Sequence, residues 1–142
     1  MMKRAAILLA LAGLACGGGG TEPTPVHPFA DVLGTWDLTT VNEQPLPYVV
    51  SSSPVTVTSI TGGRLELRPD STYVLATTAS FTNGTSTSFQ TMESSGPYDV
   101  DGREITLASS PFNPSGAPHT GFRSGSVISL QDSRGLFRLT RR

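Results

Sequence analysis

The feature that most constrains this chain is an alternation of apolar and polar residues that begins at Val32 and continues to the C-terminus. A period of two residues is typical of strands with one buried face, and no stretch shows the 3.6-residue period of an amphipathic helix. Turn-forming residues interrupt the pattern at short intervals, so several strands with tight connections are expected. The predicted strands are residues 34–41, 55–68, 72–82, 85–93, 96–100, 103–108, 121–131 and 136–141.

The turns predict which side chains share a face, because loop length fixes the register of a hairpin. A three-residue loop at 69–71 pairs Leu67 with Tyr73 and Leu65 with Leu75. The apolar residues of both strands then lie on one face, which favours this register.

Two further loops also bring apolar residues opposite one another. The expected pairs are Tyr98 with Ile105 across 101–102, and Leu130 with Phe137 and Ile128 with Leu139 across 132–135. Phe122 has the same parity as Leu130 within the expected strand 121–131, so its ring is expected on the same face.

Asn83-Gly84 is the strongest turn signal of the chain and predicts a two-residue type I′ hairpin loop. This register places Phe81 and Met92 on the face of Tyr73, but it sends Phe89 to the opposite face. Either Phe89 is exposed or a bulge shifts the register, and the sequence leaves both alternatives open.

Eight consecutive antiparallel strands with one apolar face each can close in two ways. An up-and-down barrel leaves no unpaired edge, whereas a sandwich must protect its edges. Most of the connections suit hairpins between neighbours, and a long crossing is available mainly at residues 109–120. The sequence therefore predicts an all-β fold, an eight-stranded antiparallel up-and-down barrel without a clear helix, with a β-sandwich as the alternative.

The N-terminus has the parts of a secretory signal. Lys3 and Arg4 supply positive charge, and residues 5–15 are apolar and uncharged. This run is too short for a transmembrane helix, which needs about 20 residues. A basic start, a short apolar run and a small residue before the cut are typical of a signal peptide, so residues 1–15 are expected to be removed.

Cys16 is the sole cysteine of the chain and the expected anchor. The sequence Gly13-Leu14-Ala15-Cys16 resembles the lipobox of bacterial lipoproteins, although that pattern prefers Leu where Gly13 stands. The resemblance implies that Cys16 carries lipid and that the membrane is its partner. Gly17 in place of Asp implies, by the same resemblance, passage to the outer membrane. The alternative is a plain secreted protein with an unpaired thiol.

Residues 16–31 are expected to form a tether, flexible over its glycines and stiffer over its prolines. Residues 32–142 are long enough for one domain. Cleavage removes Lys3 and Arg4, so that 8 basic residues remain against 11 acidic ones. No basic cluster of the kind that binds nucleic acid is left, apart from the terminal arginine pair.

The opening of the first expected strand, Val32-Leu33-Gly34-Thr35-Trp36, resembles the Gly-x-Trp start of lipocalins. With Tyr98-Asp99-Val100-Asp101-Gly102 and the closing Leu136-Phe137-Arg138-Leu139, the chain is similar to small bacterial lipocalin-like lipoproteins over residues 32–142. The resemblance implies that an arginine of the last strand packs over Trp36 at the closed end of the barrel. Arg141 has the right parity for this role, whereas Arg138 is expected to point outward.

Two functions of different classes follow. The resemblance implies a carrier that holds a small hydrophobic ligand, such as a fatty acid like palmitate, inside the barrel. An eight-stranded barrel can instead be filled by its own side chains, and would then act through its surface as a structural or inhibitory envelope module, with Val74 and Phe89 in contact with a partner. The residues expected to line a ligand site are Tyr73, Leu75, Phe81, Met92 and Phe122.

An enzyme is not expected. His119 is the only histidine of the domain and lies in a Pro-rich segment, and no other residue marks a nucleophile. The chain contains no Gly-x-Ser-x-Gly elbow, phosphate loop or His-Glu-x-x-His motif. We therefore predict no catalytic residue, no metal and no cofactor, and the oligomeric state stays open.

Overall fold

The computed structural model describes residues 29–108, 118–132 and 135–142. The expected signal peptide 1–15 and Cys16 lie outside these residues, as do most of the tether and residues 109–117. The described residues form ten strands and no helix. The strands are β1 (Gly34–Val41), β2 (Gln44–Pro45), β3 (Tyr48–Ser52), β4 (Thr56–Leu67), β5 (Thr72–Asn83), β6 (Ser86–Asp101), β7 (Glu104–Leu107), β8 (His119–Ser124), β9 (Val127–Asp132) and β10 (Gly135–Arg141).

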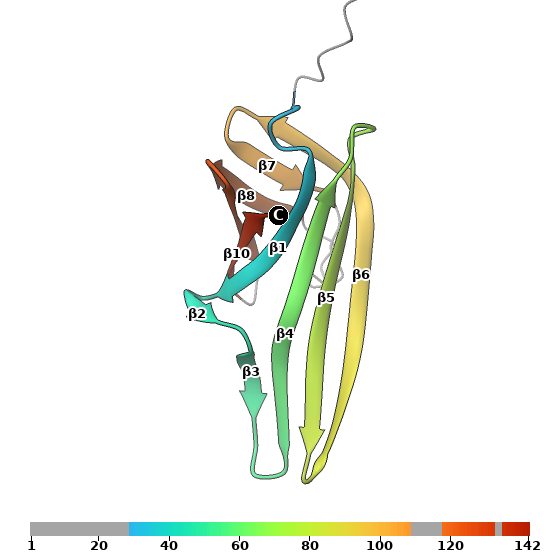
Figure 1. Ribbon diagram of the computed structural model, residues 1–142, viewed down its shortest axis with the longest axis vertical. Helices are drawn as coiled ribbons and strands as arrows, with labels where there is room; N and C mark the ends of the chain where they lie inside the picture. The colour runs from blue at the N-terminus through green and yellow to red at the C-terminus, as the bar shows by residue number, and fades with distance from the viewer. Residues whose placement is uncertain (1–28, 109–117, 133–134) are drawn as a thin grey trace, which may run out of the picture.

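The strands form one antiparallel sheet that closes on itself (Figure 1). The order is β2-β1-β10-β9-β8-β7-β6-β5-β4-β3, and a further pairing of β1 with β4 completes a barrel of eight strands. The short strands β2 and β3 lie outside this ring, beside β1 and β4. Since every barrel strand pairs with its neighbours in sequence, the predicted up-and-down barrel is confirmed and the sandwich is excluded.

Two of the predicted hairpin registers are confirmed. Leu65 pairs with Leu75 and Leu67 with Tyr73 across the turn between β4 and β5. The pairs of Leu130 with Phe137 and Ile128 with Leu139 are also present.

The two hairpins predicted at Asp101-Gly102 and Asn83-Gly84 differ from the prediction by two residues each. Asp101 pairs with Glu104, so that Tyr98 lies opposite Leu107 and not opposite Ile105. Asn83 likewise pairs with Ser86 across Gly84. In each hairpin the Gly, at φ of about +60°, is the first loop residue and the residue before it still belongs to the ladder. A shift of two keeps every side chain on its predicted face.

The predicted strand 121–131 is wrong, and with it the position of Phe122. Gly125 has φ +59°, and the chain turns there between β8 and β9, which pair Ser124 with Val127. Phe122 therefore lies opposite Ser129 and not on the face of Leu130. Its side chain is 60% exposed, so Phe122 is not a residue of the barrel interior.

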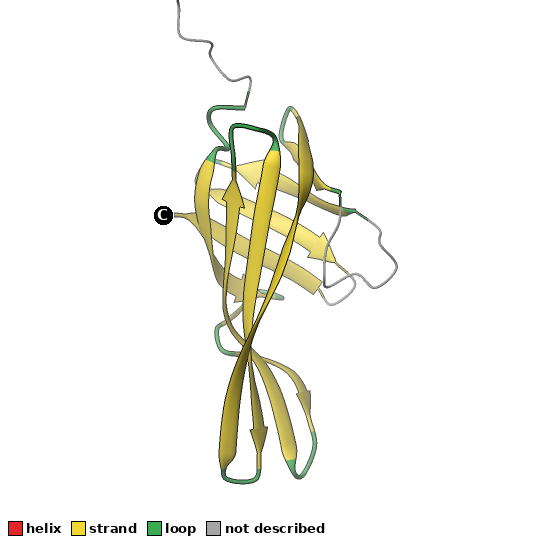
Figure 2. Ribbon diagram, turned by 90° about the vertical axis from the view of Figure 1, so that its right-hand side faces the viewer, coloured by secondary structure: helices red, strands yellow, loops and turns green. Residues whose placement is uncertain are grey.

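The predicted strands 85–93 and 96–100 are one continuous strand, β6, which runs without a break through Ser94 and Ser95. β4, β5 and β6 are longer than the barrel requires, because β1 pairs with β4 only over residues 64–67. Together with β3 they extend beyond the barrel as a four-stranded twisted sheet (Figures 1 and 2). We call this extension, residues 48–61 and 77–93, the arm.

The N-terminal segment covers one end of the barrel. Val32 is buried, and its carbonyl accepts a hydrogen bond of 3.0 Å from the indole Nε1 of Trp36. The guanidinium of Arg141 lies 5.5 Å from the centroid of the Trp36 ring, as the resemblance implied. Gly34, which begins β1, has φ +117°, a backbone conformation that a residue with a Cβ adopts only under strain.

Candidate functional site

The barrel interior is filled by its own side chains. Seven of the eight barrel strands contribute apolar residues to one cluster, and β8 contributes the buried residues His119 and Gly121 instead. The buried apolar residues of the cluster are Val32, Trp36, Leu38, Val41, Ile60, Leu65, Leu67, Tyr73, Leu75, Tyr98, Val100, Ile105, Leu107, Ile128, Leu130, Phe137 and Leu139.

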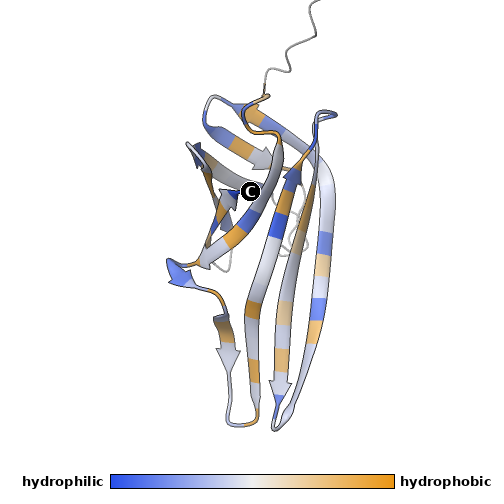
Figure 3. Ribbon diagram, in the orientation of Figure 1, coloured by the Kyte–Doolittle hydropathy of each residue, from blue (hydrophilic) through white to orange (hydrophobic). Residues whose placement is uncertain are grey.

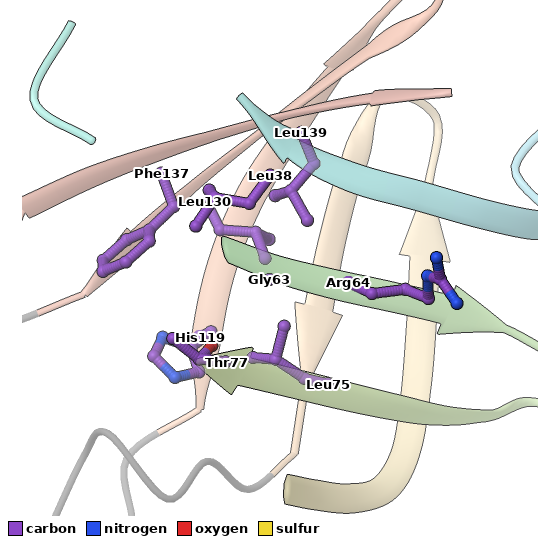
Figure 4. A pocket seen from close by; sticks show the side chains of 9 residues that line it. All are labelled: Leu38, Gly63, Arg64, Leu75, Thr77, His119, Leu130, Phe137 and Leu139. Atoms are coloured by element: carbon purple, nitrogen blue, oxygen red, sulfur yellow. The ribbon is translucent and has the colours of Figure 1, made fainter. Parts of the chain in front are cut away.

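A small cavity remains inside the barrel between Leu38, Leu75, Thr77, His119 and Leu130 (Figure 4). Its volume is about 20 Å³. One water molecule needs about 10–15 Å³ on this measure, and pockets for small-molecule ligands measure about 300–1,000 Å³. The cavity thus has room for a water molecule and not for an acyl chain.

His119 is the residue of this cavity that the sequence did not place. It begins β8 opposite Leu107, it is 3% exposed, and Figure 4 shows its ring beside Thr77. Its Nε2 has no hydrogen-bond partner among the described residues. The sequence placed His119 in a loose loop, because three prolines precede it within a few residues.

The predicted ligand-binding residues do not come together. Tyr73 is fully buried with its hydroxyl 3.2 Å from the hydroxyl of Ser94, Leu75 lines the small cavity, and Met92 packs against the core. Phe81 lies farther along β5, in the arm, where it pairs with residues of β4 and β6. Phe122 is on the outside of the barrel. The structure therefore brings three of the five toward the interior, where they serve as core.

The larger hollow lies on the outside of the barrel, where the arm begins. It has a volume of about 380 Å³, and its lining comes from β1, β4, β5 and β6. Cross-strand pairing aligns Asp37 with Arg64, Arg64 with Ala76, and Ala76 with Glu93. The methyl group of Ala76 lies between two long charged side chains, which leaves a groove above it. We call this hollow the outer groove.

The outer groove is lined by three carboxylates and one guanidinium. Arg64 donates to Asp37 at 3.1 Å, and Arg142 approaches the same carboxylate at 3.7 Å. Glu66 accepts hydrogen bonds from Arg68 at 2.9 and 3.2 Å, which lowers the pKa of the Glu66 carboxyl. In the part of the chain that the structure describes, Glu93 makes no ion pair. The groove therefore offers one carboxylate, that of Glu93, which can pair with a cation from outside the described residues.

The arm carries a different surface. Its strands are rich in Ser and Thr, so that Figure 3 shows it mostly neutral in hydropathy, and Glu93 is its sole charged residue. Several large apolar side chains are nevertheless exposed there, among them Phe89 at 69% and Val49 at 51%. Phe89 faces outward opposite Ser80, as the unbulged form of the predicted hairpin requires.

Within residues 29–108, 118–132 and 135–142, no group of His, Cys, Asp and Glu side chains is arranged to hold a metal ion. The same residues contain no helix that could cross a membrane. Comparison with protein-family models, with curated proteins and with solved structures finds no match to this chain. The fold and its surfaces alone define the class: a closed all-β barrel with a filled interior and a charged outer groove.

Proposed function

We propose that the protein is a lipid-anchored module of the bacterial cell envelope that acts through its outer surface and not through a ligand inside the barrel. The observation that carries this proposal is the contrast between the two hollows. The interior cavity measures about 20 Å³, whereas the outer groove measures about 380 Å³. A carrier of palmitate or a similar lipid fragment stays a prediction of the lipocalin resemblance, and the filled core supports the surface-acting alternative.

The anchor of this proposal is Cys16, which acyl chains would hold in the outer membrane. Two or more acyl chains give stable attachment, because each buried CH₂ contributes about 0.8 kcal/mol. The expected tether, residues 16–31, would then let the barrel stand away from the lipid surface. No step of this proposal requires catalysis, a metal or a cofactor.

The outer groove suits a positively charged group of a partner, such as a lysine or arginine side chain. Glu93 provides the unpaired carboxylate, and Ala76 provides the space above the sheet. Arg64 is held by Asp37 on the opposite wall, so it does not neutralise Glu93. Electrostatic attraction of this kind favours association more at low salt than at high salt.

The experiment is a titration of the chain from residue 17 onward with the peptide tetralysine, followed by amide resonances in NMR spectra. We expect the amides of Gly63, Ala76 and Glu93 to shift, and Glu93→Gln to weaken the binding. Glu104→Gln is the control, because Glu104 is an exposed carboxylate at the far end of the β6–β7 hairpin. Equal loss in both variants, or shifts spread over the whole surface, would contradict a site in the outer groove.

A further inference from the structure

β6 presents a long open edge in the arm. Its residues 86–97 pair with β5 on one side, but β7 pairs only with residues 98–101 on the other side. Among the described residues no strand covers the second side of 86–93. Figure 1 shows β6 at the outer margin of the arm, opposite β3.

Two backbone hydrogen bonds establish which backbone groups face this edge. The amide of Tyr98 donates to Ser71 on the β5 side, and the carbonyl of Pro97 accepts from Ala108 on the β7 side. In an antiparallel strand, the N–H and C=O of one residue point to one neighbouring strand, and those of the next residue point to the other. The backbone N–H and C=O groups of the odd-numbered residues of β6 therefore point away from β5. In the arm, the backbone groups of Thr87, Phe89 and Thr91 are therefore directed to the open edge.

This edge lacks the devices that normally protect an edge strand. Protection comes from bulges, prolines, charges or short length. The β5–β6 ladder runs through twelve pairs without a register shift, and residues 86–92 contain no charge and no proline. The opposite edge of the arm, β3, has only five residues and a bulge between Val49 and Ser51. The β3 edge of the arm is thus protected against pairing with another strand, whereas the β6 edge is not.

We propose that the β6 edge of the arm pairs with the β6 edge of a second copy of this chain, antiparallel about a twofold axis. This inference deepens the proposed function, because it names the partner of one part of the outer surface. A strand that pairs antiparallel with itself is self-complementary, as a twofold interface requires. The arm holds one charged residue per copy, Glu93, so two arms meet without charge repulsion along residues 86–92.

The orientation of the backbone groups restricts the register. Only the odd-numbered residues of β6 direct their backbone N–H and C=O groups to the open edge. In an antiparallel pair of two copies, an odd-numbered residue of one copy must therefore lie opposite an odd-numbered residue of the other. Centring the pair on Phe89 brings the two Phe89 rings opposite each other and pairs Thr87 with Thr91. Any other allowed centre separates the rings. Phe89 is 69% exposed in the single chain, so this register buries the largest apolar group of the edge.

The first test measures the oligomeric state of the chain from residue 17 onward, which retains every described strand, by sedimentation equilibrium. We expect a dimer. Phe89→Lys places two like charges opposite each other and is expected to reduce the dimer to below about a tenth of its wild-type amount. Val49→Lys is the matched control. The side chain of Val49 is exposed on the same face of the sheet as that of Phe89, but it lies on β3, at the opposite edge of the arm, so this variant should leave the dimer intact. Circular dichroism spectra establish that both variants keep the barrel.

The second test establishes the register by disulfide formation. Without Cys16 the chain has no cysteine, so Thr87→Cys and Thr91→Cys each introduce a single thiol. Directly paired residues have Cα atoms about 5.5 Å apart, which suits a disulfide. We expect a mixture of the two variants to cross-link and each variant alone not to do so.

A monomer at all concentrations, loss of the dimer in Val49→Lys, or equal cross-linking of Thr87→Cys alone would overturn the inference. A monomer whose outer groove still binds tetralysine would overturn the self-pairing and leave the proposed function standing. A dimer whose groove binds nothing would contradict the proposed function and leave the self-pairing standing.

Discussion

Arg141 lies over the indole ring of Trp36, with its guanidinium carbon 5.5 Å from the ring centroid. The same side chain also forms hydrogen bonds to the segment that covers this end of the barrel. Its two terminal nitrogens donate to the carbonyl of Asp31 at 3.2 Å and to that of Leu33 at 2.8 Å. One side chain of the last strand thus holds the first strand and the chain that leads into it.

Replacing Arg141 tests this relationship. Arg141→Met keeps an apolar stem over Trp36 but removes the charge and both hydrogen bonds, so we expect the free energy of unfolding to fall by about 1–3 kcal/mol. Arg138→Met is the control, because Arg138 is exposed and reaches Glu43 only at 3.7 Å, and its effect should stay within about 0.5 kcal/mol. Urea unfolding of both variants gives the comparison, and equal losses would refute a special role of Arg141.

Gly121 lies at a tight approach between β8 and β9. A Cβ at this position would overlap the backbone carbonyl oxygen of Ser129 and the side chain of Leu130, so Gly121→Ala should destabilise the protein by about 1–3 kcal/mol. Gly62→Ala provides a matched control, since a Cβ there would meet no atom within 4 Å. Thermal unfolding of the two variants decides the matter, and an unchanged midpoint for Gly121→Ala would show that the barrel is less tightly packed than described.

The hairpin turns show how far the sequence predicts this fold. The Leu65–Leu75 and Leu67–Tyr73 pairs could be predicted because a short turn with Pro and Asp fixes the register locally. The face of Phe122 could not be predicted. The only mark of the turn between β8 and β9 is Gly125, which stands within a stretch that otherwise alternates like one continuous strand. With a two-residue turn at this position, the side chains of β8 lie on the opposite faces from those expected for a single continuous strand.

The arm and the outer groove could not be predicted from the sequence, for a different reason. β3 carries two consecutive valines followed by serines, a pattern with no clear apolar face, and the arm holds few large apolar residues at all. The groove depends on the alignment of Asp37, Arg64, Ala76 and Glu93 across four strands, which only the closure of β1 on β4 produces. Alternation within one strand carries no information about such a row.

His119 offers a test of the interior cavity. Its buried Nε2 has no partner among the described residues, and a buried polar group without a partner costs about 1–3 kcal/mol. His119→Leu removes this group and keeps most of the side-chain volume, so we expect the free energy of unfolding to rise by about 1 kcal/mol. Urea unfolding measures the change, and a loss of stability would mean that the ring has a partner that the described residues do not provide.

Asp70 predicts a part of the acid sensitivity. Its carboxylate accepts hydrogen bonds from the hydroxyl and the amide of Thr72, at 2.6 and 3.1 Å, and these bonds hold the pKa of the Asp70 carboxyl below its ordinary value of 3.8. A lowered folded-state pKa means that this stabilisation is present above pH 3.8 and is lost as the pH falls through the folded-state pKa. Asp70→Asn should therefore lose stability relative to wild type near neutral pH but fall less steeply in acid.

Thr72→Val is the companion variant, because it removes the hydroxyl donor while Asp70 stays in place. We expect its stability to fall less steeply in acid than that of wild type, as for Asp70→Asn. Thermal midpoints between neutral pH and the lowest pH at which the barrel still unfolds cooperatively provide the measurement. Parallel curves for wild type and both variants would contradict the assignment.

The lipid anchor is tested at Cys16. In a bacterial host that lipidates exported proteins, the wild-type chain should incorporate labelled palmitate and sediment with the membranes. Cys16→Ser should incorporate none, because it lacks the thiol that carries the lipid. Label in the Cys16→Ser chain would contradict the proposed anchor.

The central claim is that the barrel is filled and that the protein acts through its outside. Native mass spectrometry of the chain from residue 17 onward, purified from a bacterial host and then mixed with palmitate, tests it most directly. We expect the apo mass before and after the addition. A stoichiometric apolar ligand that is present after purification, or is taken up from solution, and that is lost when Leu75→Trp occupies the interior, would contradict the account and establish a carrier.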